Sequence, residues 1–548
     1  MKKNLLALLA MALFVAQGFA CTNFIVGKKA SADGSVFISY SADSYGMSGF
    51  VAHFPAAVHP QGTMRAVYEW DSGRYLGEIP EAAVTYNVLG NINEHQVAIA
   101  ETTFGGREEL VDTTGIIDYG SLIYIALQRS RTAREAIGVM TSLVAEYGYC
   151  SSGESFSIAD PNEAWILEMV GKAGKEKGAV WVAIRIPDDC ISAHANQARI
   201  RKFNMKDKEN VLCSKDVIKF ARKMGYFDGK DEDFDFAAAY CPADFGGLRY
   251  CDARVWSFFN MFGSEDMTKY LAWASGDPTA EPMPLYMKPK APVSLQDMQR
   301  GMRDHYEGTP FDVTTDLGAG PYKMPYRPSP LSFKVGDKEY FNERPISTFQ
   351  TAFTFVAQLR SYLPNAIGGV MWFGTDDANM VVFTPVYCCA TEVPDCYKEQ
   401  YADPVEFSWN SSFWVFNWVS NMIYPKYSMV IDDMRNVQGS LETKFFEQSR
   451  EVEAEALAVI GSSPKYAVKL LTDFTCASAQ EALAQWKAFG EKVIVKYNDF
   501  VIKEEKNGKV LRGKTGLAGR MTRPGYPVEY CEEIVKQTGD KYLMPESK

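Results

Sequence analysis

The chain has 548 residues, of which 47% are hydrophobic, 23% are charged and 13% are aromatic, and its formal net charge is −11. These proportions are typical of a globular protein with a sizeable core, and they exclude a disordered chain. The acidic balance argues against nucleic acid as a partner, because such a protein needs a basic face to meet phosphates.

Residues 1–20 have the pattern of an export signal. Two lysines follow the initial methionine, residues 5–16 form an apolar run, and small residues stand at Gly18 and Ala20. We predict a signal peptide at 1–20, cleavage after Ala20, and a mature protein that is periplasmic or secreted. A short buried helix is the alternative interpretation. No later apolar run reaches the roughly 18 residues that span a bilayer, so no transmembrane segment is expected in the mature chain.

Cleavage after Ala20 would make Cys21 the first residue of the mature protein. Such a residue carries a thiol and a free α-amine on one carbon, so it holds a nucleophile and the base that can activate it. Without perturbation these groups have pKa values of about 8.5 and about 8, so proton transfer between them is nearly isoenergetic. Lipidation of the thiol is the competing fate, although Gly18 and Phe19 fit a lipoprotein signal poorly.

A β-hairpin is expected directly after the cleavage site. Residues 21–27 and 35–41 read as strands on either side of a polar loop. With the loop centred midway, Cys21 would lie opposite Ser41 and close to Asp43. This register would bring a carboxylate within reach of the new α-amine.

The middle of the chain alternates between strand and helix patterns. Strands are expected at 82–89 and 96–103 as a second hairpin, helices at 118–130 and 132–147, and strands at 154–160, 163–169, 179–186, 346–360 and 368–387. Such an order predicts a layered α+β domain with two sheets.

Two further regions complete the expected organisation. Residues 204–345 show no clean period and are expected to form loops and short helices that decorate the core. Beyond residue 395 the composition shifts, and 437–461 and 478–498 read as helices rich in Ala, Glu, Lys and Leu. We therefore predict a main domain at 21–395 and a mainly helical region at 396–548 packed on it.

The motif Cys21-Thr-x-x-x-Val-Gly-Lys-Lys-Ala-Ser-x-Asp-Gly-Ser35 resembles the start of the dipeptidase A-type cysteine peptidases, which are relatives of penicillin V acylase and choloylglycine hydrolase in the N-terminal-nucleophile superfamily. The resemblance continues through segments at 91–103, 160–168, 181–188, 194–200, 254–256, 303–309 and 372–374. It implies a four-layer αββα fold and amide-bond hydrolysis, with dipeptides as the expected substrates. No cofactor is implied, and no C-x-x-C pair or histidine-rich cluster indicates a metal.

Carried over residue by residue, the resemblance assigns a role to five positions. Cys21 is the nucleophile, and Asp43 is the polar neighbour that holds its α-amine. Asn196 is a side-chain donor to the oxyanion, and the backbone N–H of Thr103 is the second donor. Arg254 supports the nucleophile. Without the resemblance, each of the polar residues could equally be an ordinary turn, loop or ion-pair residue.

One position departs from the pattern of the family. Relatives generally carry a basic residue three positions before the aspartate, and here that residue is Tyr40. The electrostatic help that an arginine would give the thiolate is therefore absent or supplied elsewhere. We expect Tyr40 to contribute to the substrate pocket instead.

The leading interpretation is an exported cysteine dipeptidase that works through a thioester acyl-enzyme at Cys21, with small peptides as its partners. The first alternative keeps the fold but changes the acyl group, giving an N-acyl amidase for bile-acid conjugates or penicillins. The second is a non-catalytic lipoprotein lipidated at Cys21. Association into a homo-oligomer is left open by the sequence.

Overall fold

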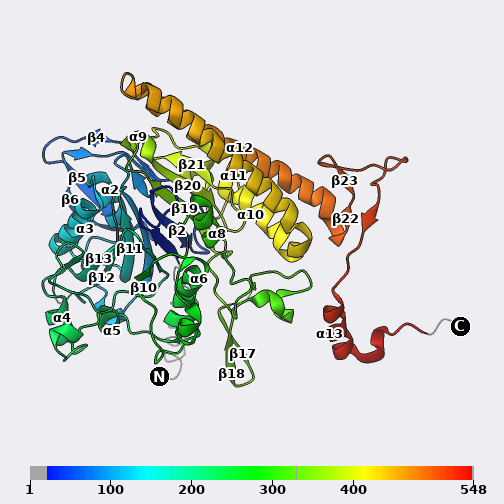
Figure 1. Cartoon of the computed structure of the whole chain (residues 1–548), viewed down its shortest axis with the longest axis horizontal. Helices are drawn as coiled ribbons and strands as arrows, with labels where there is room; N and C mark the ends of the chain where they lie inside the picture. Colours follow the sequence, from blue (N-terminus) through cyan, green and yellow to red (C-terminus); the bar gives the residue numbers. More distant parts are fainter. Residues whose placement is uncertain (1–20, 175, 329, 546–548) are drawn as a thin grey trace.

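The computed structural model describes residues 21–174, 176–328 and 330–545, so the predicted signal peptide lies outside the described residues (Figure 1). The fold is α+β, with two large antiparallel sheets and a mainly helical C-terminal part. At this level the predicted fold class is confirmed. None of the described helices is both long and apolar enough to cross a membrane.

The first large sheet has the beginning of the described chain near its centre. Its strand order is β16-β14-β1-β2-β19-β20-β21, and neighbouring strands are antiparallel. The strands are β1 (Asn23–Val26), β2 (Val36–Asp43), β14 (Ile191–His194), β16 (Tyr286–Met287), β19 (Thr351–Leu359), β20 (Gly369–Thr375) and β21 (Thr384–Tyr387). Cys21 therefore enters the sheet between β14 and β2.

The second large sheet contains the predicted central meander. Its order is β15-β13-β12-β11-β10-β9-β8-β3, again antiparallel. The strands are β3 (His53–Phe54), β8 (Val88–Leu89), β9 (Ile92–Asn93), β10 (Ala98–Gly105), β11 (Gly153–Ala159), β12 (Ala164–Gly171), β13 (Ala179–Ile186) and β15 (Val211–Cys213). The strands predicted at 154–160, 163–169 and 179–186 are confirmed.

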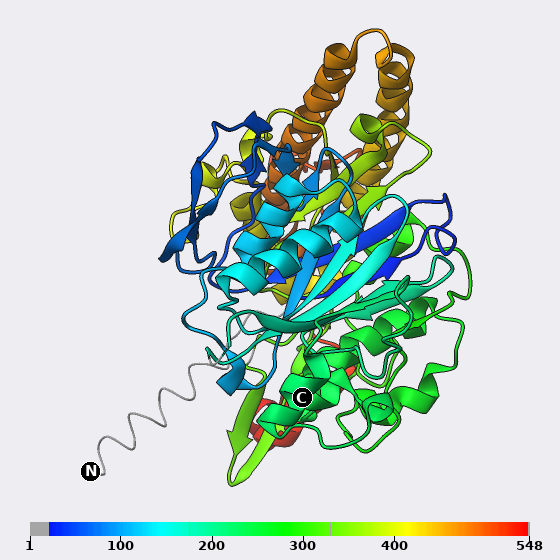
Figure 2. The same cartoon turned by 90° about the vertical axis from the view of Figure 1, so that its left-hand side faces the viewer.

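The two sheets pack against each other, with β2 contacting β10 and β11 and β1 contacting β10. Helices α2 (Tyr119–Arg129) and α3 (Ala133–Tyr147) cover the other face of the second sheet (Figure 2). Strands β2 and β11 are consequently buried along their whole length. Because polar side chains in such strands cannot reach solvent, they must find partners inside the protein, and this is where the candidate site forms.

Both predicted helices over the second sheet are confirmed, and each begins at a side-chain cap. Asp118 accepts a hydrogen bond from the backbone N–H of Ser121, and Thr132 accepts one from that of Glu135. The Glu135 carboxylate accepts from the backbone N–H of Arg131, one residue before the position that a reciprocal capping box requires.

The C-terminal helices pack on the first sheet and are longer than predicted. Helix α10 (Ser412–Ile423) contacts β20, and α11 (Tyr427–Val459) and α12 (Pro464–Tyr497) contact β21 (Figure 1). The predicted start of the last helix, residue 478, is wrong by fourteen residues. Ser463-Pro464 marks its true beginning, since proline is favoured in the first helical turn.

The first hairpin forms as predicted, but its register differs by one residue. Ile25 lies opposite Ile38 and Thr22 lies opposite Ser41, so Cys21 falls beside Ala42 rather than opposite Ser41. The turn is not centred midway because the loop after Val26 bonds to other segments, beginning with the backbone N–H of Gly27 to the carbonyl of Cys190.

The hairpin predicted from 82–89 and 96–103 is wrong. Strand β8 pairs with β9 across a tight turn at Gly90, whose φ of 53° suits glycine, and β10 pairs with β9 and β11 instead. The start of the 82–89 run leaves the large sheet, because β7 (Val84–Thr85) pairs with β4 (Ala57–Val58). A separate hairpin precedes it, formed by β5 (Met64–Tyr68) and β6 (Tyr75–Pro80).

The predicted loops and short helices of 204–345 are confirmed. They include α4 (Val217–Met224), α5 (Phe236–Tyr240), α6 (Ala253–Phe262), α7 (Leu271–Ala274), α8 (Leu295–Met302) and the hairpin β17 (Ser332–Val335) with β18 (Lys338–Phe341); α9 (Asn365–Gly368) lies further along. After α12 come β22 (Ile502–Lys503), β23 (Glu505–Lys506), β24 (Lys509–Val510), β25 (Met521–Thr522) and α13 (Val528–Thr538). Figure 1 shows this last segment extending away from the body, and α13 has no buried residue.

Candidate active site

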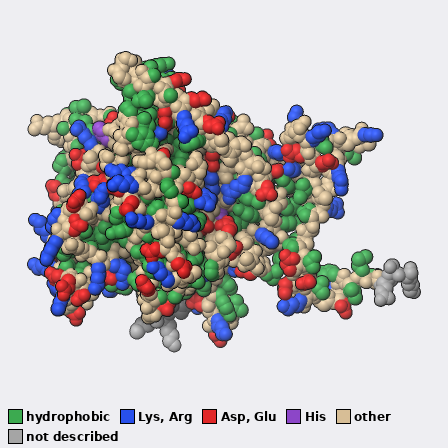
Figure 3. Space-filling view, in the orientation of Figure 1, with side chains coloured by type: hydrophobic (Ala, Val, Ile, Leu, Met, Phe, Trp, Pro, Cys, Tyr) green, Lys and Arg blue, Asp and Glu red, His purple; other side chains and the backbone are tan. Residues whose placement is uncertain are grey.

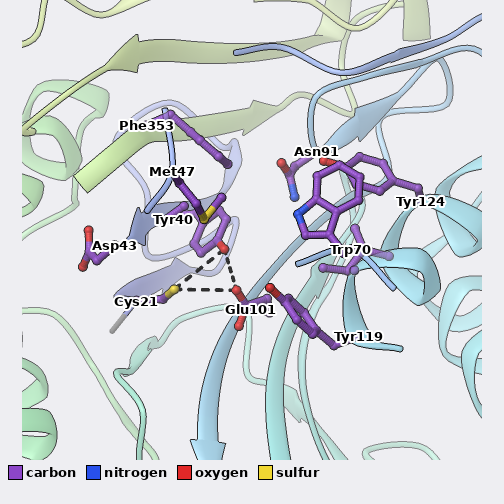
Figure 4. Close-up of a pocket in the computed structure, with 13 residues that line it drawn as sticks. Cys21, Tyr40, Asp43, Met47, Trp70, Asn91, Glu101, Tyr119, Tyr124 and Phe353 are labelled. Carbon is purple, nitrogen blue, oxygen red and sulfur yellow. Dashed lines mark hydrogen bonds between the residues drawn. The ribbon is translucent and has the colours of Figure 1, made fainter. Parts of the chain in front are cut away.

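Cys21 precedes β1, and its side chain lies between the two sheets. The residue is 2% exposed and lines a narrow cavity with Tyr40, Asp43 and Glu101 (Figure 4). A wider cavity of 650 Å³ adjoins it. Five residues line both cavities: Met47, Trp70, Asn91, Tyr124 and Phe353. The thiol therefore lies at the inner end of a continuous recess.

Arg254 connects the backbone of Cys21 to the opposite wall of the site. It lies in α6, directly after a π-helical turn at Gly247–Asp252, and is fully buried. Its Nη1 donates to the carbonyl of Cys21 at 2.6 Å, and its Nη2 donates to Oδ1 of Asn196 at 2.9 Å. The planar fork of the guanidinium thus fixes the nucleophile and the amide relative to each other.

Asn196 and Thr103 lie together, as their predicted shared role requires. Nδ2 of Asn196 donates to the carbonyl of Thr103 at 2.8 Å. The backbone of Asn196 has a φ of 64°, a left-handed conformation that asparagine tolerates better than most side chains. Conformations of this kind are often retained at functional sites. Whether the two residues donate to an oxyanion stays a prediction.

Asp43 forms a buried ion pair that the sequence did not reveal. Its carboxylate accepts from Nη2 of Arg344 at 2.5 Å, from the hydroxyl of Thr351 at 2.7 Å and from that of Ser41 at 3.2 Å. Asp43 and Arg344 have side-chain exposures of 0% and 1%. Arg344 lies in the aperiodic 204–345 region, where an isolated arginine gives no sequence signal. The predicted contact of Asp43 with the α-amine stays a prediction.

Tyr40 joins the nucleophile to a second buried carboxylate. Its hydroxyl donates to Oε1 of Glu101 at 2.5 Å, and Sγ of Cys21 lies 3.6 Å from the same oxygen and 3.8 Å from the hydroxyl oxygen (Figure 4). Glu101 was missed at the sequence level. A signal was present, because Glu101 is two residues before Thr103 and so lies on the same face of β10.

Glu101 lies beside Glu154, which comes from β11. Burial and the neighbouring Glu101 carboxylate raise the pKa of Glu154 well above its usual range. Burial also raises the pKa of Glu101, while hydrogen bonds from Tyr40, Glu154 and Cys21 oppose the shift. We therefore place the proton on Glu154, which donates to Glu101, and the negative charge on Glu101.

The thiol of Cys21 is in a strongly anionic environment. Burial, followed by the carboxylates of Glu101 and Asp43, raises the pKa of the thiol well above its ordinary value, against a hydrogen bond from the backbone N–H of Asp43 and the contact with the Tyr40 hydroxyl. The thiol is therefore neutral in the chain that still carries residues 1–20. Activation requires a positive charge or a base at this point.

The two histidines in matched motifs do not take part in this arrangement. Burial lowers the pKa of His194 to about 3, and its ring nitrogens bond to the hydroxyls of Thr102 and Ser157, so it is a neutral structural residue. His305 pairs with Glu307 elsewhere. Neither histidine lies among the residues that line the cavity at Cys21.

The described residues contain neither a disulfide nor a cluster of side chains that could hold a metal ion. All eleven cysteines lie within the described residues, and none of them forms a disulfide. Over the described ranges, no group of three or more His, Cys, Asp or Glu side chains is placed to hold a metal ion. On the face shown in Figure 3, basic and acidic side chains are intermingled.

A buried thiol at the inner end of a recess, with an amide and an arginine fixed around it, defines a cysteine-dependent hydrolase. The chain belongs to Peptidase family C69, whose model matches residues 20–440. It is thus a cysteine-type peptidase, a hydrolase of peptide bonds.

Curated relatives of the chain are named as dipeptidases. A "Probable dipeptidase" of Salmonella dublin is 27% identical over 409 residues, covering 70% of this chain and 84% of the relative. A "Probable dipeptidase" of Latilactobacillus sakei is 24% identical over 464 residues, covering 80% and 89%. "Dipeptidase A" of Lactobacillus helveticus is 24% identical over 453 residues, covering 78% and 85%.

Proposed function

We propose that this protein is an exported cysteine dipeptidase with the four-layer fold of the N-terminal-nucleophile hydrolases, and that cleavage after Ala20 creates its catalytic residue. The observation that carries the proposal is the position of Cys21. It is the residue that follows the predicted cleavage site, and its thiol lines the recess while Arg254 holds its carbonyl. The names of the relatives favour dipeptides as substrates.

The reaction proceeds in two halves. The α-amine of Cys21 takes the thiol proton, and the thiolate sulfur attacks the carbonyl carbon of the scissile amide. Asn196 and the N–H of Thr103 donate to the oxyanion. The protonated amine then gives its proton to the leaving nitrogen, the carbon–nitrogen bond breaks, and a thioester remains. Water, deprotonated by the same amine, attacks the thioester and releases the acid, which restores the thiol.

The charges around Cys21 explain why the amine is needed. Glu101 and Asp43 disfavour a thiolate, and no arginine occupies position 40 to oppose them. An ammonium group formed on Cys21 itself would supply the missing positive charge at the shortest distance available. Lipidation is disfavoured, because a lipid on a thiol buried between two sheets would displace the packing around it.

N-terminal sequencing of the secreted protein, combined with a dipeptide panel, tests the proposal. We expect a mature chain that begins at Cys21 and releases free amino acids. A Cys21→Ala variant should retain less than about 0.1% of that activity, since loss of a covalent nucleophile typically costs several powers of ten. A mature chain with another first residue, or undiminished hydrolysis by the variant, would contradict it.

A further inference from the structure

The recess at Cys21 is acidic and aromatic. Five carboxylates line the two cavities: Asp43, Asp71, Glu101, Glu399 and Asp403. Among the described residues, no Lys, Arg or His side chain lines either cavity. Figure 4 shows Trp70, Tyr119 and Tyr124 across the cavity from Cys21. Carboxylates combined with aromatic rings suit a cationic group.

Two buried carboxylates, Asp43 and Glu101, lie beside the thiol of Cys21, and they differ in their partners. Asp43 is paired with Arg344, whereas Glu101 forms no ion pair with any described Lys, Arg or His. Its donors are the hydroxyl of Tyr40, the thiol of Cys21 and the protonated Glu154, none of which carries a positive charge. At 2% exposure, a carboxylate without a counter-charge is costly, so while the α-amine of Cys21 is neutral this arrangement favours a cation from outside.

The geometry identifies where that cation would lie in a substrate. In a peptide with a free N-terminus, the α-nitrogen is separated from the first carbonyl carbon by Cα alone, a distance of about 2.5 Å. Oε1 of Glu101 lies 3.6 Å from Sγ of Cys21, which attacks that carbon. An ammonium group on the attacked residue can therefore reach Glu101 when the substrate Cα lies on the Glu101 side of the sulfur.

The hydrogen bonding of Glu101 also allows this contact. Oε1 accepts from Tyr40 and from the thiol, which together use its two lone pairs. When the thiol gives up its proton, one lone pair is released just as the substrate reaches the sulfur. Tyr40 and Glu154 hold the carboxylate in place throughout.

We propose that Glu101 binds the N-terminal ammonium group of the substrate, so that the enzyme requires a free α-amine on the residue whose carbonyl Cys21 attacks. This inference rests on the proposed function of Cys21. It makes Glu101 a specificity-determining residue that selects unblocked peptides over N-acylated compounds. Tyr40, which replaces the basic residue usual in relatives, positions this carboxylate.

Three substrates test the inference: the best-cleaved member of a dipeptide panel, its analogue with a hydroxyl in place of the ammonium, and its N-acetyl derivative. For the wild type, kcat/KM for the dipeptide should exceed that for the hydroxyl analogue by about 30-fold or more, as expected for removal of one member of a buried charge pair. The ratio isolates ammonium recognition, because the same thiol attacks both substrates.

Two matched variants separate charge from packing. Glu101→Gln should reduce the ratio to within about threefold of unity while the hydroxyl analogue is still cleaved. Glu154→Gln replaces a protonated acid behind Glu101 by an amide that also donates, so it keeps the charge of Glu101 and should lower the ratio much less than Glu101→Gln does. A Glu101→Gln variant with an unchanged ratio would overturn the inference.

Further outcomes distinguish the inference from the function on which it rests. A wild type that cleaves the dipeptide, the hydroxyl analogue and the N-acetyl derivative equally well would refute ammonium recognition and leave the dipeptidase intact. A wild type that cleaves no dipeptide would refute the proposed function itself. If Glu101→Gln does not fold, competitive inhibition of the wild type decides, and amino acid amides should inhibit at least about 30-fold more strongly than their α-hydroxy analogues.

Discussion

Removing one partner of the ion pair between Asp43 and Arg344 should be among the most destabilising single changes in the site. Arg344→Met removes the guanidinium and leaves the carboxylate fully buried, with hydrogen bonds from Thr351 and Ser41 and without its ion-pair partner. Breaking a buried pair in this way costs about 3–5 kcal/mol in the free energy of unfolding, because the remaining charge is uncompensated. Activity should fall as well, since the backbone N–H of Asp43 bonds to the sulfur of Cys21.

Urea denaturation at pH 7 of the full chain, in which the nitrogen of Cys21 is an amide and carries no charge, measures the effect. The double variant Asp43→Asn/Arg344→Met should be considerably more stable than the sum of the two single losses predicts, because it contains no unpaired charge. As a control, Arg222→Met breaks the exposed pair with Asp231 and should cost less than about 1 kcal/mol. An Arg344→Met loss below 1 kcal/mol, or strict additivity in the double variant, would refute the reasoning.

The same variant should show a characteristic pH dependence. Burial raises the pKa of Asp43, and Arg344 opposes this shift in the wild type. Without Arg344 the folded-state pKa rises further above the unfolded value of about 3.9. The folded state then binds the proton more tightly, so the stability deficit is largest above the folded pKa and narrows as pH falls toward 4. A deficit that grows on acidification would contradict this account.

Three further outcomes are expected. Asn196→Gly removes the proposed oxyanion donor and tolerates the φ of 64°, so kcat should fall about 10²- to 10³-fold. The variant also loses the side-chain hydrogen bonds to Arg254 and Thr103, so the free energy of unfolding should fall by about 1–3 kcal/mol. A normal kcat would contradict the assignment. Arg254→Lys keeps the charge but not the fork between Cys21 and Asn196, and kcat should drop by about tenfold or more. Burial raises the pKa of Asp376 to about 7, so the folded state binds a proton there that the unfolded state has already lost. The free energy of unfolding of the wild type should therefore decline as pH rises from about 4 to 7. Urea titrations should show a smaller decline for Asp376→Asn.

Local signals in the sequence were sufficient for elements whose boundaries depend on their own residues. The helices over the second sheet were placed within about one residue because Asp118 and Thr132 cap them, and the meander of β11, β12 and β13 was placed by its turns. The two longest C-terminal helices begin earlier than predicted, α11 at Tyr427 rather than at 437 and α12 at Pro464 rather than at 478.

Contacts between segments far apart in the chain could not be predicted from local sequence patterns. The register of the first hairpin depends on bonds from its loop to residues 188–190, which no turn rule contains. Of the site, the motif resemblance supplied Cys21, Asn196 and Arg254, which the fold does bring together. Arg344 was missed because it reaches Asp43 across three hundred residues of chain.

If cleavage after Ala20 exposes Cys21 as proposed, the burial of Cys21 in the folded domain limits when that cleavage can take place. Arg254 donates a hydrogen bond to the carbonyl of Cys21, and the backbone of Thr22 pairs with that of Ser41. The backbone next to the proposed cleavage point is therefore held in the sheet once the domain has folded. A signal-removing protease needs an extended, accessible chain, and it would meet one only while translocation is still under way. Under the proposed function, export and activation would then be a single timed step, because a copy that folds before cleavage would keep the nitrogen of Cys21 in a peptide bond and lack the catalytic amine.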